Sequence, residues 1–220
     1  MGVRETNTFV ILRSTLQRLP LYYCYINERL KAGDKYVSAA AMAQFLDLNP
    51  VLVRKDLETV SSVKGLSRVG FLTEALERDL RTFLGYDNVD DAILVGIGGL
   101  GHALLNYNGF SDFGLNIVAG FDSNENLHGI KVGGKPVLPL EKLENLVQRL
   151  NIRLGIITVP KEHAQKTCDL MIRSGIRAIW NFAPVTLDVR KDVFVKNENL
   201  AASFASLSRR LYRTYQKRQD

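Results

Sequence analysis

The sequence has no apolar run that approaches the ~18 residues of a membrane-spanning helix, so we expect no transmembrane segment. Its N-terminus, M-G-V-R-E-T-N-T, lacks the apolar core that a signal peptide carries. Only two cysteines occur, Cys24 and Cys168, and neither belongs to a C-x-x-C pair or to a metal-ligand spacing. These absences predict a cytoplasmic protein with reduced thiols, no membrane partner and no bound metal.

Charge is unevenly distributed along the 220 residues, whose formal net charge is +6. Residues 1–85 contain 12 Lys and Arg against 9 Asp and Glu, and residues 201–220 contain 5 against 1. Residues 86–200 are almost balanced, with 12 against 13. A basic N-terminal part gives weak support for contact with an acidic polymer such as DNA.

A glycine-rich turn follows the apolar run Ala92–Val95 in the spacing G-x-G-x-x-G. The first glycine, Gly96, suits a tight turn, and the second, Gly98, lets the backbone approach a pyrophosphate. The third, Gly101, permits a helix to pack closely on the strand, and the N-terminus of that helix offers free N–H groups to the anion. The pattern predicts a dinucleotide site that includes the intervening residues Ile97, Gly99 and Leu100.

The acidic residue that completes this fingerprint is Asp122, which ends a second apolar run at Ile117–Phe121. Its carboxylate would accept hydrogen bonds from the adenosine ribose and would repel a 2′-phosphate, so the sequence favours NAD(H) over NADP(H). Apolar strands continue to alternate with helical segments as far as residue 195. This alternation indicates an α/β domain with a doubly wound, Rossmann-like parallel sheet over residues 86–199.

Helical patterns dominate the first 85 residues. Apolar spacing predicts a helix over Ser14–Ala32, with Pro20 early enough for a first turn to tolerate it. A short helix over Ser38–Leu46 follows, and Pro50 opens another as its first residue. Two short helices joined by about three residues, the second of them basic, are typical of a helix-turn-helix.

Basic residues of the second short helix, Arg54 and Lys55, would meet base edges or phosphates in a major groove. The next segment, Ser61–Phe71, is polar and glycine-containing, which predicts a β-hairpin wing. A solvated basic face is the alternative for these cations. The candidate DNA contacts are Ser38, Asn49, Arg54, Lys55, Lys64 and Arg68.

No catalytic group is expected. His102 and His163 lie near turns that would face a ligand, but no arginine–carboxylate constellation accompanies them and no domain remains to hold a second substrate. Asn181 ends a predicted strand at the ligand edge, where contact with cofactor and capping of the strand end are nearly equal alternatives. Further candidate cofactor contacts at this edge are Val159, Pro160, Phe182, Ala183 and Pro184.

The chain resembles the Rex family of redox-sensing transcriptional repressors through six motifs that keep their order and spacing. They are S-T-L-Q-R-L-P-L-Y-Y (Ser14–Tyr23), V-R-K-D-L (Val53–Leu57), V-G-I-G-G-L-G-H-A-L-L-N-Y-N-G-F (Val95–Phe110), A-G-F-D (Ala119–Asp122), V-P-K-E-H-A-Q (Val159–Gln165) and N-F-A-P-V (Asn181–Val185). Together they span nearly the whole chain.

The resemblance implies a homodimer that binds double-stranded operator DNA. It divides the chain into a winged helix-turn-helix domain over residues 1–85, a Rossmann-like NAD(H) domain over residues 86–199 and a C-terminal helix over residues 200–220 that is swapped onto the partner. It further implies that NADH releases the operator, so that the NADH/NAD⁺ ratio sets transcription. Arg18 and Tyr107 would join a polar cluster between the first helix and the nicotinamide.

The sequence departs from the family pattern in three places. The wing, V-S-S-V-K-G-L-S-R-V-G-F, lacks two of the usual glycines and the usual arginine register. Asn199 stands where the family has an acid, and Gly99 where it has an asparagine. An amide cannot form a charged bridge with Arg18, so these changes concern operator choice and redox response more than the fold.

Two other functions stay open at the level of sequence. One is a small NAD-dependent oxidoreductase, which requires hydride turnover. The other is a CoA- or nucleotide-binding regulatory protein that uses its N-terminal helices for protein docking, and such a protein would give no sequence-specific shift of promoter DNA.

Overall fold

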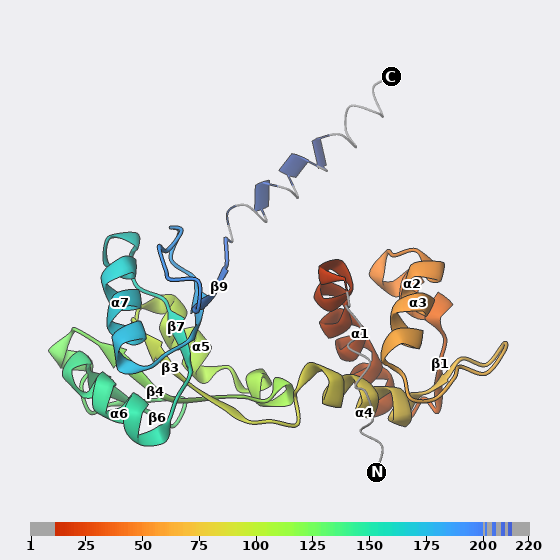
Figure 1. The fold of residues 1–220 in the computed structure, drawn as a ribbon, viewed down its shortest axis with the longest axis horizontal. Helices are drawn as coiled ribbons and strands as arrows, with labels where there is room; N and C mark the ends of the chain where they lie inside the picture. The colour runs from red at the N-terminus through yellow and green to blue at the C-terminus, as the bar shows by residue number, and fades with distance from the viewer. Residues whose placement is uncertain (1–11, 200, 202–203, 206–207, 210, 213–220) are drawn as a thin grey trace, which may run out of the picture. The chain divides into compact units, whose positions relative to one another are not determined.

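The computed structural model describes residues 12–199 together with residues 201, 204, 205, 208, 209, 211 and 212. The chain divides between Asn88 and Val89 into two compact units, here called unit 1 and unit 2 (Figure 1). The division lies just after Gly85, where sequence analysis ended the first domain. Among the described residues, no helix has the combined length and hydropathy needed to cross a bilayer.

Unit 1 is a small helical unit with one short sheet. Its described elements are α1 (Arg13–Lys31), β1 (Tyr36–Val37), α2 (Ala39–Leu46), α3 (Pro50–Val60), β2 (Phe71–Leu72) and α4 (Thr73–Leu84). Strands β1 and β2 pair antiparallel, and Gly85 ends α4 in a left-handed conformation with φ +75°. The predicted winged helix-turn-helix is confirmed, with α2 and α3 as its two short helices.

The core of unit 1 forms where α1 packs against the other helices. Fully buried side chains include Leu19, Tyr22, Val53 and Leu80. The prediction that Pro20 belongs to a first turn is wrong, because α1 begins at Arg13 and the proline lies in its interior. Proline removes one helical hydrogen bond there, and tertiary burial of the neighbouring turns outweighs that cost.

The predicted wing is a narrow loop between α3 and β2 rather than a regular hairpin (Figure 1). A single antiparallel bridge joins Leu66 to Gly70, and Arg68 at the tip has φ +63°. Gly70 has φ +107°, and a Cβ there would collide with the Val37 carbonyl oxygen. The close approach of the loop to β1 therefore requires glycine at this position.

Unit 2 is built on a seven-stranded sheet in the order β5-β6-β4-β3-β7-β8-β9. The strands are β3 (Asp90–Val95), β4 (Leu115–Asp122), β5 (Lys131–Val132), β6 (Lys135–Pro139), β7 (Leu154–Ile157), β8 (Ala178–Asn181) and β9 (Phe194–Asn197). All neighbours are parallel except the hairpin of β5 with β6. Without β5, the order is that of the doubly wound dinucleotide-binding sheet, in which β3 and β7 flank the switch point. The predicted Rossmann-like sheet is confirmed.

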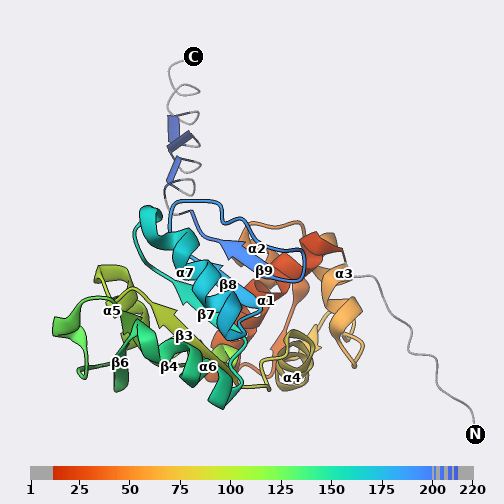
Figure 2. The same cartoon turned by 60° about the vertical axis from the view of Figure 1, so that its left-hand side comes forward.

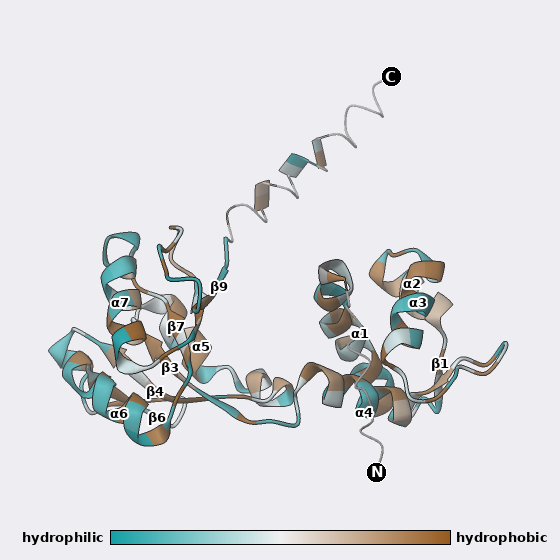
Figure 3. Ribbon diagram, viewed as in Figure 1, coloured by the Kyte–Doolittle hydropathy of each residue, from teal (hydrophilic) through white to brown (hydrophobic). Residues whose placement is uncertain are grey.

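Helices cover the two faces of this sheet unequally. One face packs against α6 (Leu143–Leu150) and α7 (Lys161–Ser174), whereas the other packs against α5 (Gly99–Asn106) (Figure 2). The outward turns of α6 and α7 are hydrophilic in Figure 3, as expected of helices that bury one stripe only. Between β8 and β9 the chain returns without a helix.

The predicted C-terminal helix over residues 200–220 is described in part. Residues 201, 204, 205, 208, 209, 211 and 212 are helical, and the exposed Phe204 and Leu211 belong to them. The remaining positions, including Leu207 and Tyr215, lie outside the described residues. The swap of this helix onto a partner stays a prediction.

Candidate functional site

The glycine-rich turn joins β3 to α5 at the carboxyl edge of the unit 2 sheet. Gly96 has φ +100°, and a Cβ there would lie 2.8 Å from Cγ1 of Val159. A Cβ on Gly101 would collide with the Gly96 carbonyl oxygen. Only glycine fits at these two positions, because one needs the left-handed conformation and the other allows no side chain.

The second glycine of the motif faces open space. A Cβ at Gly98 or at the adjacent Gly99 would meet no atom within 4 Å. Gly98 is the N-cap of α5 and provides no side-chain cap, so the N–H groups of the first turn remain available. Ile97, between Gly96 and Gly98, is buried, and Leu100, between Gly99 and Gly101, is exposed. The uncapped helix N-terminus suits a diphosphate.

Asp122 ties the end of β4 to this turn. Its Oδ2 accepts a hydrogen bond from the Ile97 N–H at 2.6 Å, and its Oδ1 accepts one from the Asn124 N–H at 2.8 Å. Each carboxylate oxygen retains further acceptor capacity, so ribose hydroxyls can be accommodated as well. Asp122 therefore both shapes the turn and offers an anionic acceptor beside it.

Thr158 secures the turn from the opposite side. Its hydroxyl donates to the Gly96 carbonyl oxygen at 2.6 Å and lies 3.1 Å from the Val95 carbonyl oxygen. Sequence analysis did not single out Thr158, since one threonine at the end of an apolar strand forms no motif. Its position directly before the Val159-Pro160 pair was the only available signal.

A cavity of about 770 Å³ opens beside the turn, and it has the size of a site for a small ligand or cofactor. Five predicted cofactor residues that lie far apart in sequence line it together: Gly96, Gly98, Asp122, Val159 and Pro160. The fold therefore gathers the glycine motif, the acid and the end of β7 around one space.

Three basic side chains of α7 line the same cavity: His163, Lys166 and Arg173. All three are exposed, and none forms a hydrogen bond or ion pair within the described part of the chain. His163 was a sequence candidate for catalysis, whereas Lys166 and Arg173 belong to no sequence motif. Their helical spacing gave no signal because the position of α7 against the cavity depends on the tertiary fold.

Asn181 shapes the turn after β8. Its amide nitrogen donates to the carbonyl oxygen of Val185 at 2.9 Å and to Oδ1 of Asn197 at 2.8 Å. Its Oδ1 accepts from the N–H of Ala183 at 3.0 Å. Because the side chain is fully buried, these contacts support the capping alternative. The predicted cofactor contacts at Asn181, Phe182, Ala183 and Pro184 stay predictions, since none of the four lines the cavity described above.

Aromatic rings extend from this turn to the end of α5. Phe182 packs against Trp180 at 4.8 Å between ring centroids, and Trp180 packs against Phe110 at 5.7 Å. Phe110 in turn contacts Tyr107 edge to face at 4.9 Å. The predicted nicotinamide-side residue Tyr107 thus lies at one end of an aromatic row on the α5 face of the sheet, and it is more than half exposed.

In unit 1, two predicted DNA contacts act as helix caps. Ser38 Oγ accepts the Ala41 N–H at 3.0 Å and begins α2, and Asn49 Oδ1 accepts the Val51 N–H at 2.8 Å and begins α3. The Ser38 hydroxyl proton and the Asn49 amide N–H₂ are not used in these caps. Ser38 therefore fixes the start of α2 and Asn49 the turn between α2 and α3, and both side chains keep donors for an external anion.

The four predicted DNA-contacting cations are all exposed. Arg54 and Lys55 lie on the outer face of α3, where Arg54 Nε donates to Glu58 Oε1 at 2.8 Å. Lys64 and Arg68 lie on the wing loop. The fold thus places two cations on the second helix of the helix-turn-helix and two on the loop beside it.

A buried polar cluster joins α1 to α3. Arg18 donates to both carboxylate oxygens of Asp56, and Tyr22 and Thr15 donate to the same carboxylate. Burial, followed by the hydrogen bond to Asp56, raises the pKa of Tyr22 to about 12. The predicted link of Arg18 to the nicotinamide side stays a prediction, and the partner of Arg18 in the structure is Asp56.

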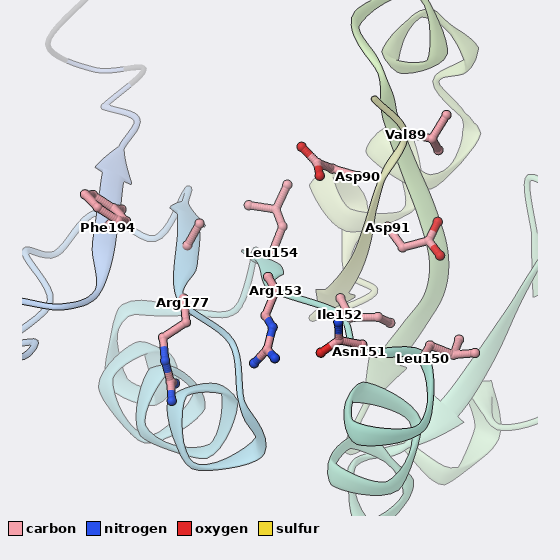
Figure 4. Close-up of a pocket in the computed structure, with 11 residues that line it drawn as sticks. Val89, Asp90, Asp91, Leu150, Asn151, Ile152, Arg153, Leu154, Arg177 and Phe194 are labelled. Carbon is pink, nitrogen blue, oxygen red and sulfur yellow. The ribbon is translucent and has the colours of Figure 1, made fainter. Parts of the chain in front are cut away.

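A second cavity, of about 440 Å³, lies at the amino ends of β3, β7 and β8 (Figure 4). Its arginines cap α7: Arg153 donates to the Gly175 carbonyl oxygen and Arg177 to that of Ile176. Figure 4 shows both guanidinium groups directed toward the helix and away from the Asp90 carboxylate. These cations are already used in structure, so this cavity is a weaker candidate than the one at the glycine turn.

Within the described residues, no group of three or more His, Cys, Asp or Glu side chains has metal-binding geometry. His102 lies 3.2 Å from the Asn106 amide, and His128 Nε2 lies 2.9 Å from the Asp122 carbonyl oxygen. These histidines have local structural contacts.

Two family models match the chain, one in each unit. Residues 11–58 match the model described as "Putative DNA-binding protein N-terminus", and residues 87–185 match "CoA binding domain". The first covers the helix-turn-helix and the second covers the glycine turn and most of the sheet.

Curated relatives match over nearly the full length. The chain is 38% identical to the redox-sensing transcriptional repressor Rex of Bacteroides fragilis, over 95% of this chain and 94% of that protein. It is 35% identical to the protein of the same name from Thermoanaerobacter sp., over 92% and 90%. Among solved structures, RSP in complex with β-NADH matches with a TM-score of 0.85 and 33% identity, over 96% of this chain and 98% of that one. RSP with β-NAD⁺ and operator DNA matches with a TM-score of 0.84 and 33% identity, over 96% of both chains.

Proposed function

This chain belongs to the Rex family of redox-sensing transcriptional repressors, and from that premise we propose that it binds operator DNA when NADH is scarce and leaves it when NADH binds. One observation carries the proposal: a single chain contains a basic helix-turn-helix in unit 1 and a diphosphate-binding turn with its acid in unit 2. Solved relatives bind NADH in one crystal, and NAD⁺ with operator DNA in another. The cytoplasm, where the NADH/NAD⁺ ratio varies, is the expected location.

The cofactor is NADH or NAD⁺, and the glycine turn holds its diphosphate. The first-turn N–H groups of α5 bind the phosphates through the opening at Gly98, and Asp122 accepts the adenosine ribose hydroxyls. Val159 and Pro160 line the same space. The turn Asn181–Pro184 and Tyr107 complete the nicotinamide side. No residue of the chain is assigned a catalytic role.

DNA binding uses a homodimer, since two recognition helices related by two-fold symmetry match the two halves of a palindromic operator. In each protomer, α3 enters the major groove and the wing follows the backbone. NADH changes operator affinity only to the extent that it binds the two dimer conformations with different affinities. The C-terminal helix over residues 200–220, with its exposed Phe204 and Leu211, is swapped onto the partner.

A DNA-binding titration at defined salt tests the proposal directly. Full-length protein is titrated onto its own promoter in the absence of cofactor, with NADH and with NAD⁺. We expect tight sequence-specific binding without cofactor and with NAD⁺, and at least a tenfold weaker affinity with NADH. Equal affinity with and without saturating NADH would contradict the redox response, and absence of any specific binding would contradict the repressor.

The alternative of an oxidoreductase is answered by family membership, since the relatives that cover the chain are repressors. The match to the model described as "CoA binding domain" indicates the type of nucleotide-binding fold. The identity of the ligand is tested by the titration. A competition experiment with CoA in place of NADH separates the two ligands, and we expect CoA to leave operator binding unchanged.

A further inference from the structure

Two apolar side chains stand on the outer face of α3 at its first turn. Val51 is 62% exposed and Leu52 is 38% exposed, whereas the next residue, Val53, and Leu57 one turn further on belong to the core of unit 1. Exposure of apolar surface costs free energy unless a partner covers it. The packing of unit 1 therefore leaves most of Val51 and more than a third of Leu52 uncovered.

The backbone around this pair is fixed. Asn49 caps the helix by accepting the N–H groups of Val51 and Leu52 at 2.8 and 3.3 Å. Pro50 provides a rigid first residue. The two apolar side chains are thus held at the N-terminal end of the second helix, which is the part of a helix-turn-helix that contacts base edges.

Two basic residues follow the pair along the helix, and they indicate the kind of surface that covers it. Lys55 lies three and four residues after Leu52 and Val51, on the same face of the helix. Arg54 is adjacent, but its Nε edge is occupied by Glu58. An apolar centre with cations beside it is complementary to the floor of a major groove between two phosphate backbones, and not to an apolar protein surface.

We infer that Val51 and Leu52 read thymine bases in the operator by contact with their 5-methyl groups. The thymine methyl is the one apolar group that the four base pairs present in the major groove. Neither side chain can donate or accept a hydrogen bond, so recognition at these positions depends on burial of that methyl. This inference rests on the proposed DNA-binding function and specifies its base readout.

The test replaces individual operator thymines by deoxyuridine, which removes the 5-methyl group and preserves base pairing. Binding of the full-length protein is measured without cofactor at one salt concentration. Burial of one methyl-sized group predicts an affinity about fourfold weaker for each contacted thymine. Thymines outside the contacted positions should show no change and locate the contacts within each half-site.

Alanine variants assign the effect to residues. In Val51→Ala and Leu52→Ala, the ratio of affinities for thymine and deoxyuridine operators should fall toward one at the position each residue contacts. Leu21→Ala is the matched control, because it removes a leucine that is 49% exposed on α1, and it should keep the full ratio. Both exposed positions are outside the core, so circular dichroism should show unchanged folding.

The outcomes separate this inference from the proposed function. Specific binding that is insensitive to every deoxyuridine substitution would overturn the methyl readout and leave the repressor intact. Absence of specific binding to any promoter fragment would overturn both. A change of oligomeric state in the alanine variants, with an unchanged methyl ratio, would assign the apolar pair to an interface between copies of the chain.

Discussion

The guanidinium of Arg18 donates two hydrogen bonds to the carboxylate of Asp56, from Nε to Oδ2 at 2.7 Å and from Nη2 to Oδ1 at 3.0 Å. The first residue belongs to α1 and the second to α3, which carries the proposed DNA contacts. Only 6% of the Asp56 side chain and 17% of the Arg18 side chain are exposed. The pair therefore fixes the position of the recognition helix by a contact that is largely shielded from water.

Acid should destabilise unit 1 through this contact. Burial alone would raise the pKa of Asp56, but hydrogen bonds from Arg18, Tyr22 and Thr15 outweigh burial and hold the pKa below its usual value. Since the folded carboxyl has the lower pKa, its stabilising effect is complete above pH ~4 and is lost as the pH falls through the folded pKa. Chemical denaturation at pH values from 7 to 3 should show that loss.

The variant Asp56→Asn should flatten this acid dependence and lower the free energy of unfolding by about 2 kcal/mol at pH 7, because it leaves Arg18 without its charged partner. Glu58→Gln is the matched control. It breaks the exposed Arg54–Glu58 pair and should cost less than about 0.5 kcal/mol. If both variants lowered the free energy of unfolding by the same amount, burial of the Arg18–Asp56 pair would not explain its contribution to stability.

Alkali should act through Tyr22. Burial, together with the hydrogen bond to Asp56, raises its pKa to about 12 from the usual value near 10. The protonated phenol therefore stabilises the fold fully below pH 10, and this contribution is lost as the pH rises toward 12. Denaturation curves of Tyr22→Phe should lack that alkaline loss, although the variant starts about 1 kcal/mol less stable because one buried hydrogen bond is gone.

Replacement by alanine should change the free energy of unfolding very differently at two glycines of the same turn. Gly101→Ala should destabilise unit 2 by more than about 2 kcal/mol, since the new methyl collides with the Gly96 carbonyl oxygen. Gly99→Ala should leave the free energy of unfolding unchanged or slightly higher, because its Cβ meets open space and alanine favours a helix. Thermal unfolding measures both, and a similar shift in the two variants would refute the packing argument.

Asp122→Ala should weaken NADH binding by at least about tenfold, the loss expected when charge-assisted hydrogen bonds to the ribose are removed. The acceptor for the ribose disappears, and so do the hydrogen bonds that hold the Ile97 and Asn124 N–H groups. Isothermal titration calorimetry with NADH gives the affinity. Asp122→Asn, which keeps one acceptor oxygen, should fall between the wild type and the alanine variant, and unchanged affinity in both would remove Asp122 from the site.

Arg54→Ala should weaken operator affinity and reduce the slope of log affinity against log salt by about one, if Arg54 neutralises one phosphate. NADH binding should be unaffected. Lys142→Ala, which removes a cation from unit 2 near the start of α6, serves as the control and should leave the salt slope unchanged. An unaltered slope in Arg54→Ala would place this arginine outside the interface.

Much of unit 2 could be predicted from the sequence because its signals are local. The roles of Gly96 and Gly101 follow from the conformation and clearance that a strand–turn–helix imposes, and the structure shows both. The parallel, doubly wound sheet is likewise expected from alternating strands and helices. The role of Asn181 was harder to predict, because a polar residue at the end of a strand can equally contact a ligand or cap the strand. Only its hydrogen bond to Asn197 of β9 distinguishes these two roles.

Features that depend on distant partners escaped the sequence analysis. Asp56 lies 38 residues from Arg18 in the sequence, and neither local pattern predicts their hydrogen bonds. Lys166 gained significance only when α7 packed against the cavity. Pro20 lies well inside both the predicted helix Ser14–Ala32 and α1, and local rules accept proline only in a first turn, so its interior position depends on the packing of α1. The wing was predicted as a β-hairpin, and the structure forms it with the single bridge between Leu66 and Gly70.

The amide of Asn181 has a mechanical consequence. It bonds the backbone of the turn at the ligand edge and also the side chain of Asn197, the last residue of β9. The Glu198 N–H adds a bond to the Asn181 carbonyl oxygen. The turn can shift only if β9 moves with it or if the hydrogen bonds of Asn181 to Asn197 and Glu198 break. The turn after β8 is thereby coupled through Asn197 and Glu198 to the end of β9, the strand that leads into the C-terminal segment.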